Sequence, residues 1–143
     1  MQTLLITILS SGVLSILGML LADRFLTERI AIAGSLAGLH LSHNPGVAFG
    51  ISFAPFVQMA LILAALLAIV WMSRNVRGFL QQIAYGLILG GGIANIIDRL
   101  PDGLVTDYFQ IGAFPVFNVA DSCITIGVLI LILEMLVWRR RKM

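Results

Sequence analysis

Residues 118–138, NVADSCITIGVLILILEMLVW, form an apolar run interrupted by only two acidic residues, Asp121 near its start and Glu134 near its end. A helix needs roughly 20 predominantly apolar residues to cross about 30 Å of hydrocarbon. We therefore expect this stretch to be a membrane-spanning helix. A carboxylate one turn inside such a helix is costly and usually functional, which makes Asp121 the first candidate for a functional residue.

The composition of the whole chain agrees with a membrane protein. Hydrophobic residues make up 59% of the 143 residues and charged residues 11%, too little polar surface to coat a soluble globule. We expect one all-α integral-membrane domain over residues 1–143. Its four spans are predicted at about residues 3–22, 55–73, 78–97 and 118–138. The first is interpreted as a retained span because no basic residue precedes it.

The distribution of basic residues predicts the orientation, because short cytoplasmic loops collect Lys and Arg. Arg74 and Arg77 lie between the second and third spans, and residues 139–142 form a basic tail. Both termini are therefore expected in the cytoplasm, with outer loops at residues 23–54 and 98–117. The tail is interpreted as an orientation signal and not as a nucleic-acid site.

The first outer loop contains a candidate β element. Glycines recur between residues 30 and 53, and apolar and polar residues alternate at Leu39-His40-Leu41-Ser42. This pattern predicts a small extracytoplasmic strand or hairpin between spans one and two. His40 and His43 lack the further His, Cys or Glu that a metal site needs, so no metal is predicted. Cys123 is the only cysteine, which rules out an intrachain disulfide.

The second outer loop brings another carboxylate, Asp107, toward Asp121. Two carboxylates held close together share a proton, so one can polarise a carbonyl group while the other activates water. Such a pair titrates as a unit. The residues alone therefore indicate a candidate membrane hydrolase.

Other polar residues are spaced to support this pair. Asn95 shares a helix face with Asp98 and Arg99, and Asn118 stands three residues before Asp121. Simpler structural roles are also open. Asp98 and Arg99 could form an ion pair, or Arg99 could bind a backbone carbonyl group or a lipid head group. Asn118 with Asp121 could cap a helix, and Asp102 is interpreted as a turn residue after a proline.

Five motifs, in order between four spans, resemble the bacterial lipoprotein signal peptidases (signal peptidase II). The motifs are Asp23 at the end of span one, NPGVAF at 44–49, GGGIANIIDR at 90–99, GLVTDY at 103–108, and FPVFNVAD at 114–121 followed by Gly127. The chain departs from many members at Thr27, where they carry lysine, and at Ala94, where they carry glycine. Neither departure removes a proposed catalytic group.

The resemblance implies an aspartyl endopeptidase of the bacterial inner membrane. It would cleave the signal peptide from diacylglyceryl-modified prolipoproteins just before the lipidated cysteine, at the outer-leaflet face. Asp107 and Asp121 would be catalytic, with no metal or cofactor. Supporting or substrate-binding roles would fall to Asp23, Asn44, Gly46, Asn95, Asp98, Arg99 and Asn118. The expected partners are prolipoproteins and membrane lipids, and a monomer is expected.

Two alternatives use the same residues differently. The carboxylates could relay protons or bind a cation in a small transporter subunit. A transporter would place its acids near mid-membrane, usually with repeat symmetry, whereas here they cluster at the outer ends. A purely structural subunit would leave the convergence of carboxylates from separate segments without an explanation.

Overall fold

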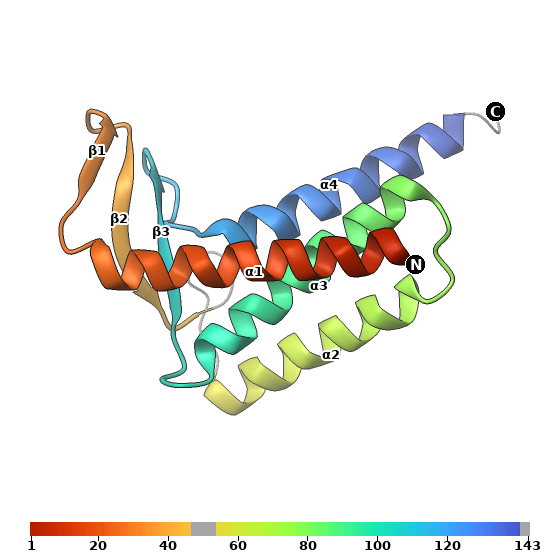
Figure 1. Ribbon diagram of the computed structural model, residues 1–143, viewed down its shortest axis with the longest axis horizontal. Helices are drawn as coiled ribbons and strands as arrows, with labels where there is room; N and C mark the ends of the chain where they lie inside the picture. The colour runs from red at the N-terminus through yellow and green to blue at the C-terminus, as the bar shows by residue number, and fades with distance from the viewer. Residues whose placement is uncertain (47–53, 141–143) are drawn as a thin grey trace.

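The computed structural model describes residues 1–46 and 54–140. Four helices run side by side, and a small sheet packs across one end of them (Figure 1). The elements in chain order are α1 Gln2–Phe25, β1 Ile30–Ala33, β2 Ala37–Asn44, α2 Pro55–Ser73, α3 Phe79–Arg99, β3 Val105–Ile111 and α4 Val119–Arg140. All four helices are long and apolar enough to cross a membrane. The predicted fold class, four spans with a small β element, is confirmed.

Helix α3 is the centre of the bundle, and three consecutive glycines explain why. A Cβ atom on Gly90 would lie 2.6 Å from the carbonyl oxygen of Ile8 in α1. On Gly91 it would lie 2.5 Å from the carbonyl oxygen of Ala120 in α4, and on Gly92 it would lie 2.6 Å from Cδ2 of Leu66 in α2. Successive helical residues point about 100° apart, so each glycine admits a different neighbour.

The predicted close packing along α3 is also present one turn earlier. A Cβ atom on Gly86 would lie 2.5 Å from Cβ of Thr7 in α1, and Ala94 is fully buried. The other helices expose large apolar side chains on their outer faces, such as Phe56, which is 84% exposed. Exposed apolar surface on this scale fits helices that face lipid and not water.

The sheet is larger than the sequence predicts. Strands β1 and β2 form the expected hairpin in the first outer loop, but β3 from the second outer loop pairs antiparallel with β2 to give the order β1-β2-β3. The prediction missed β3 because residues 105–108 are all buried, so this strand shows no polar and apolar alternation. The pairing sets Ser42 opposite Asp107 and Asn44 opposite Val105, which brings the first outer loop to the carboxylate.

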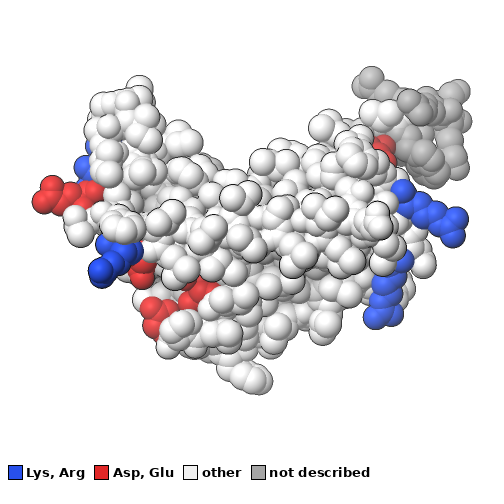
Figure 2. All heavy atoms as spheres, viewed as in Figure 1, with Lys and Arg blue, Asp and Glu red and all other residues white. Residues whose placement is uncertain are grey.

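The end of α3 differs from the prediction. The helix continues through Asp98 and Arg99, which were placed at the start of the outer loop 98–117. Asn118, expected as the first residue of the fourth span, immediately precedes α4. Acidic side chains gather at the sheet end of the molecule, and basic side chains predominate at the opposite end (Figure 2).

Candidate active site

Asp107 lies in β3 with its carboxylate enclosed by amide groups. The residue is 2% exposed. Its Oδ2 accepts a hydrogen bond from Nδ2 of Asn44 at 3.1 Å, and its Oδ1 accepts one from Nδ2 of Asn118 at 2.9 Å. Each carboxylate oxygen therefore has a defined donor, and the donors come from β2 and from the residue before α4.

Asp121 lies in the first turn of α4, where its carboxylate caps the helix and also accepts a hydrogen bond from Asn95. Its Oδ2 accepts the backbone N–H of Asn118 at 3.3 Å, while Oδ1 of Asn118 accepts the backbone N–H of Asp121 at 2.9 Å. This reciprocal pair is a helix N-cap, so the capping alternative is confirmed. Its Oδ1 accepts a further hydrogen bond from Nδ2 of Asn95 at 2.9 Å. The cap thereby fixes the direction in which the carboxylate points.

A bridge of two asparagine side chains joins the carboxylates. Nδ2 of Asn118 lies 3.1 Å from Oδ1 of Asn95, in addition to its contact with Asp107. Because Asn95 in turn donates to Asp121, the hydrogen bonds run continuously from one carboxylate to the other. Asn118 is fully buried and Asn95 is 8% exposed, so water competes little for these bonds. The structure thus brings together both predicted carboxylates and three predicted asparagines.

Burial is the main influence on the protonation of Asp107. Loss of solvent raises the pKa of Asp107 to about 7 from an ordinary value of 3.8. The hydrogen bond from Asn44 and the charge of Arg99 act against this rise, while the charges of Asp121 and Asp98 add to it. Near neutral pH, Asp107 therefore exchanges between its protonated and ionised forms, the state suited to proton transfer.

The raised pKa predicts how stability depends on pH. The folded protein binds this proton more tightly than the unfolded chain, so its contribution to the free energy of unfolding is complete below about pH 4 and is lost as pH rises through about 7. We expect the thermal midpoint of the wild type in detergent to fall between about pH 5 and about pH 8, by more than that of Asp107→Asn. A difference between the two midpoints that stays constant with pH would contradict the raised pKa.

Asp98 and Arg99 hold separate parts of the site. Oδ2 of Asp98 accepts the backbone N–H of Thr106 at 2.6 Å, which fixes the beginning of β3. Nη2 of Arg99 donates to the carbonyl oxygen of Gly46 at 2.5 Å. Within residues 1–46 and 54–140 the two side chains form no ion pair with each other, so that prediction is wrong and the backbone-carbonyl alternative is confirmed. Adjacent residues on a helix point in different directions and do not face each other.

Gly46 and Asp102 have turn roles. The backbone N–H of Gly46 donates to Oδ1 of Asn44 at 2.8 Å, which orients the Asn44 amide. Oδ1 of Asp102 accepts the backbone N–H of Leu104 at 2.8 Å, and Gly103 adopts a φ of 83°. The turn role predicted for Asp102 is therefore confirmed.

Asp23 stands apart from the two carboxylates. Its Oδ1 lies 3.0 Å from Nε2 of His43, and both side chains are about half exposed. His43 immediately precedes Asn44 in β2, so this contact ties the end of α1 to the strand that reaches Asp107. Asp23 is a brace for the sheet and not a direct partner of the carboxylates.

Sequence reasoning missed one polar residue near the site. Gln58 in α2 is 4% exposed, and its Nε2 donates to the carbonyl oxygen of Pro45 at 3.0 Å. A signal was available, since Gln58 is a polar residue near the outer end of an otherwise apolar span. Such a residue usually faces protein and has a partner there.

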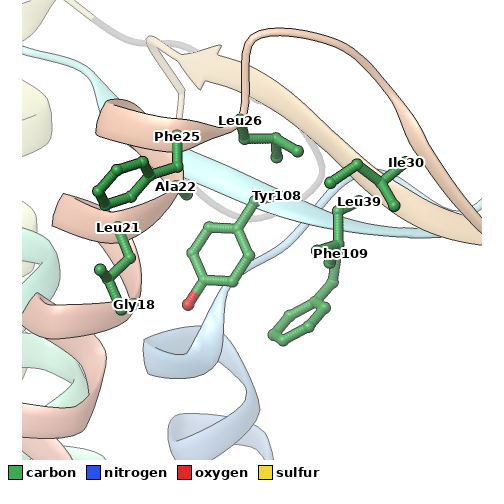
Figure 3. A pocket seen from close by; sticks show the side chains of 9 residues that line it. All are labelled: Gly18, Leu21, Ala22, Phe25, Leu26, Ile30, Leu39, Tyr108 and Phe109. Carbon is green, nitrogen blue, oxygen red and sulfur yellow. The ribbon is translucent and has the colours of Figure 1, made fainter.

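An apolar pocket of about 290 Å³ lies between α1 and the sheet (Figure 3). It is lined by Gly18, Leu21, Ala22, Phe25, Leu26, Ile30, Leu39, Tyr108 and Phe109. Tyr108 directly follows Asp107, and successive side chains of a strand point to opposite faces. Its ring is buried against α1, and that burial raises the pKa of its hydroxyl group. Tyr108 therefore lines the apolar pocket between α1 and the sheet.

Four apolar helices with paired aspartates at one end define an integral membrane protein with a buried polar site, a class that includes membrane aspartic peptidases. The family described as "Signal peptidase (SPase) II" matches residues 4–137. The chain belongs to the signal peptidase II family.

Individual relatives agree with this assignment. The lipoprotein signal peptidase of Chlorobium luteolum is 42% identical over 126 residues, covering 77% of this chain and 75% of the relative. That of Shouchella clausii is 37% identical over 121 residues, covering 82% and 80%. A solved bacterial membrane enzyme, 24% identical, superimposes with a TM-score of 0.91 over 100% of this chain and 93% of its own, which shows a shared fold.

The family assignment also identifies the activity of the chain. The chain is a peptidase of the aspartic type that cleaves signal peptides from prolipoproteins. The transporter alternative is not supported, because the matching relatives are peptidases.

Proposed function

We propose that Asp107 and Asp121 are the catalytic pair of this peptidase. The observation that carries the proposal is the continuous hydrogen-bond bridge through Asn95 and Asn118, which holds two carboxylates from separate elements in one fixed arrangement. A structural role alone would not require both carboxylates at this depth, since each is costly to place there.

The environments of the two carboxylates suggest different roles. Asp107 is almost fully buried and carries a proton for much of the time near pH 7, so it donates a hydrogen bond to the scissile carbonyl oxygen. Asp121 is partly exposed and takes a proton from the attacking water. The water oxygen bonds to the carbonyl carbon, the amide nitrogen receives a proton, and the C–N bond breaks. These steps consume one water and need no metal.

We propose further that the substrate is a diacylglyceryl-modified prolipoprotein, cut just before the lipidated cysteine at the outer face of the bacterial cytoplasmic membrane. The placement rests on charge: Arg74 and Arg77 lie in the link between α2 and α3, at the end of the bundle away from the sheet. The positive-inside rule makes that end, with both termini, cytoplasmic. Because one chain supplies both carboxylates and their donors, a monomer is sufficient.

The experiment is cleavage of a lipid-modified prolipoprotein by the purified protein in the presence of a chelator. We expect one cut, before the modified cysteine, by the wild type and none by Asp121→Asn at the same folded concentration. The same prolipoprotein without its lipid tests the substrate class, because each buried methylene stabilises binding by about 0.8 kcal/mol. Loss of activity with chelator, or equal cleavage of the unlipidated substrate, would overturn the corresponding part of the proposal.

A further inference from the structure

We infer that Gln58 of α2 is a positioning residue of the catalytic pair, acting on Asp107 through the turn at Asn44, Pro45 and Gly46. The inference rests on the proposed function and adds α2 to the elements that build the site. Gln58 is connected to the Asp107 carboxylate through one hydrogen bond to this turn and a second hydrogen bond from the turn to Asp107.

The last step of that path depends on which way the Asn44 amide points. Its Oδ1 accepts the backbone N–H of Gly46 at 2.8 Å, so its Nδ2 is the end that faces Oδ2 of Asp107, 3.1 Å away. If the amide turned over, its oxygen would face the carboxylate and the N–H of Gly46 would lose its acceptor. The position of the turn therefore decides whether Oδ2 of Asp107 receives the hydrogen bond from Asn44.

Two helices hold the turn in place through consecutive carbonyl groups. Nε2 of Gln58 donates to the carbonyl oxygen of Pro45 at 3.0 Å, and Nη2 of Arg99 donates to that of Gly46 at 2.5 Å. Proline fixes its own φ near −65°. The bond from Gln58 to the Pro45 carbonyl group therefore also restrains the backbone between Asn44 and Pro45. The bonds from Gln58 in α2 and Arg99 in α3 thus hold the two carbonyl groups that follow Asn44, and together they restrain the position of Asn44.

Burial makes the Gln58 contact effective. The side chain is 4% exposed and lies one turn inside a helix whose remaining side chains are largely apolar and exposed. A hydrogen bond shielded from water in this way is a strong restraint, and an amide without its partner is expensive there. Farther along the helix, Leu66 of α2 packs against Gly92 of α3. Gln58 connects α2 to the turn beside Asp107.

The restraint acts on protonation as well as on geometry. The charged groups around Asp107 are Asp121 on α4 and Asp98 and Arg99 on α3, and replacing Gln58 removes none of these charges. Asn44 stabilises the ionised form of Asp107. If the turn loosens, this donor is lost for part of the time and the carboxylate keeps its proton to higher pH.

The test compares pH profiles of cleavage for Gln58→Leu and the wild type. We expect kcat to fall about tenfold with KM nearly unchanged, since a small displacement of a catalytic group reduces the rate strongly. The alkaline limb of the kcat profile should move upward by roughly half a pH unit or more. Gln58→Met, which keeps the length of the side chain, should give the same shift if Gln58→Leu folds poorly.

Two further variants separate positioning from general destabilisation. Gln82→Leu removes a similarly buried amide in α3, whose Nε2 donates to the carbonyl oxygen of Arg77 at 3.1 Å at the far end of the bundle, and should leave the pH profile unchanged. In an Asn44→Ala background, Gln58→Leu should cause no further shift, because its effect passes through Asn44. An unshifted limb, or a full additional effect without Asn44, would overturn the inference. Wild-type cleavage that is lost in Asp121→Asn would show that the proposed function stands regardless.

Discussion

Asp107→Asn is expected to abolish cleavage, with a fall in kcat of at least about 10²–10⁴-fold, while the protein still folds in the membrane. Asparagine has nearly the same size as aspartate, and its oxygen can still accept from Asn118 or Asn44. It cannot hold or transfer the proton that the mechanism requires. The measurement is the initial rate of prolipoprotein cleavage at matched folded concentrations.

Asp102→Asn is the matched control for this substitution. Asp102 is an exposed turn residue in the same outer loop, and asparagine can replace its contact with the N–H of Leu104. Its activity should equal that of the wild type, which would exclude a general effect of removing an acid from this loop. Full activity in Asp107→Asn would instead exclude the carboxylate pair as the catalytic group.

Much of this architecture follows from the sequence because long apolar runs have few alternatives in a membrane. The helices were predicted within a few residues, and the spacing Asn118 to Asp121 already indicated a cap. The polar companions of the carboxylates were also predicted, because the chain offers few polar residues at this depth. The resemblance to the signal peptidase II motifs then predicted that these residues together form the site of an aspartic peptidase.

What the sequence could not predict are contacts that depend on register and on direction. Strand β3 lacks alternation because both its faces are buried, so its pairing with β2 was missed, and with it the reason that Asn44 reaches Asp107. Arg99 binds Gly46, which is 53 residues away in the chain, and not its neighbour Asp98. Such partners follow from how helices and sheet pack together, and local patterns do not contain that information.

A second large effect is expected from Gly91→Ala, although this residue contacts neither carboxylate. A Cβ atom there would lie 2.5 Å from the carbonyl oxygen of Ala120 and 3.1 Å from Cγ1 of Ile124, so α4 must move away from α3. Asp121 directly follows Ala120, and its 2.9 Å bond from Asn95 spans the same two helices. Overpacking of this kind destabilises by about 1–3 kcal/mol. A displacement approaching 1 Å reduces the rate by about 10²-fold.

Gly12→Ala makes the Gly91→Ala experiment decisive. Both substitutions gain about 1 kcal/mol of helix propensity. The Cβ atom at Gly12, however, would lie 3.6 Å from the carbonyl oxygen of Gly90, an ordinary contact. Gly12→Ala should equal or exceed the wild type in thermal stability and keep its cleavage activity, and Gly91→Ala should lose both. Gly92→Ala meets only the flexible end of Leu66 and should be intermediate in stability with its activity largely retained. If Gly91→Ala cleaved as fast as Gly12→Ala, the close approach of α3 and α4 would not be what sets the distance between Asn95 and Asp121, and the cap at Asn118 would have to position Asp121 alone.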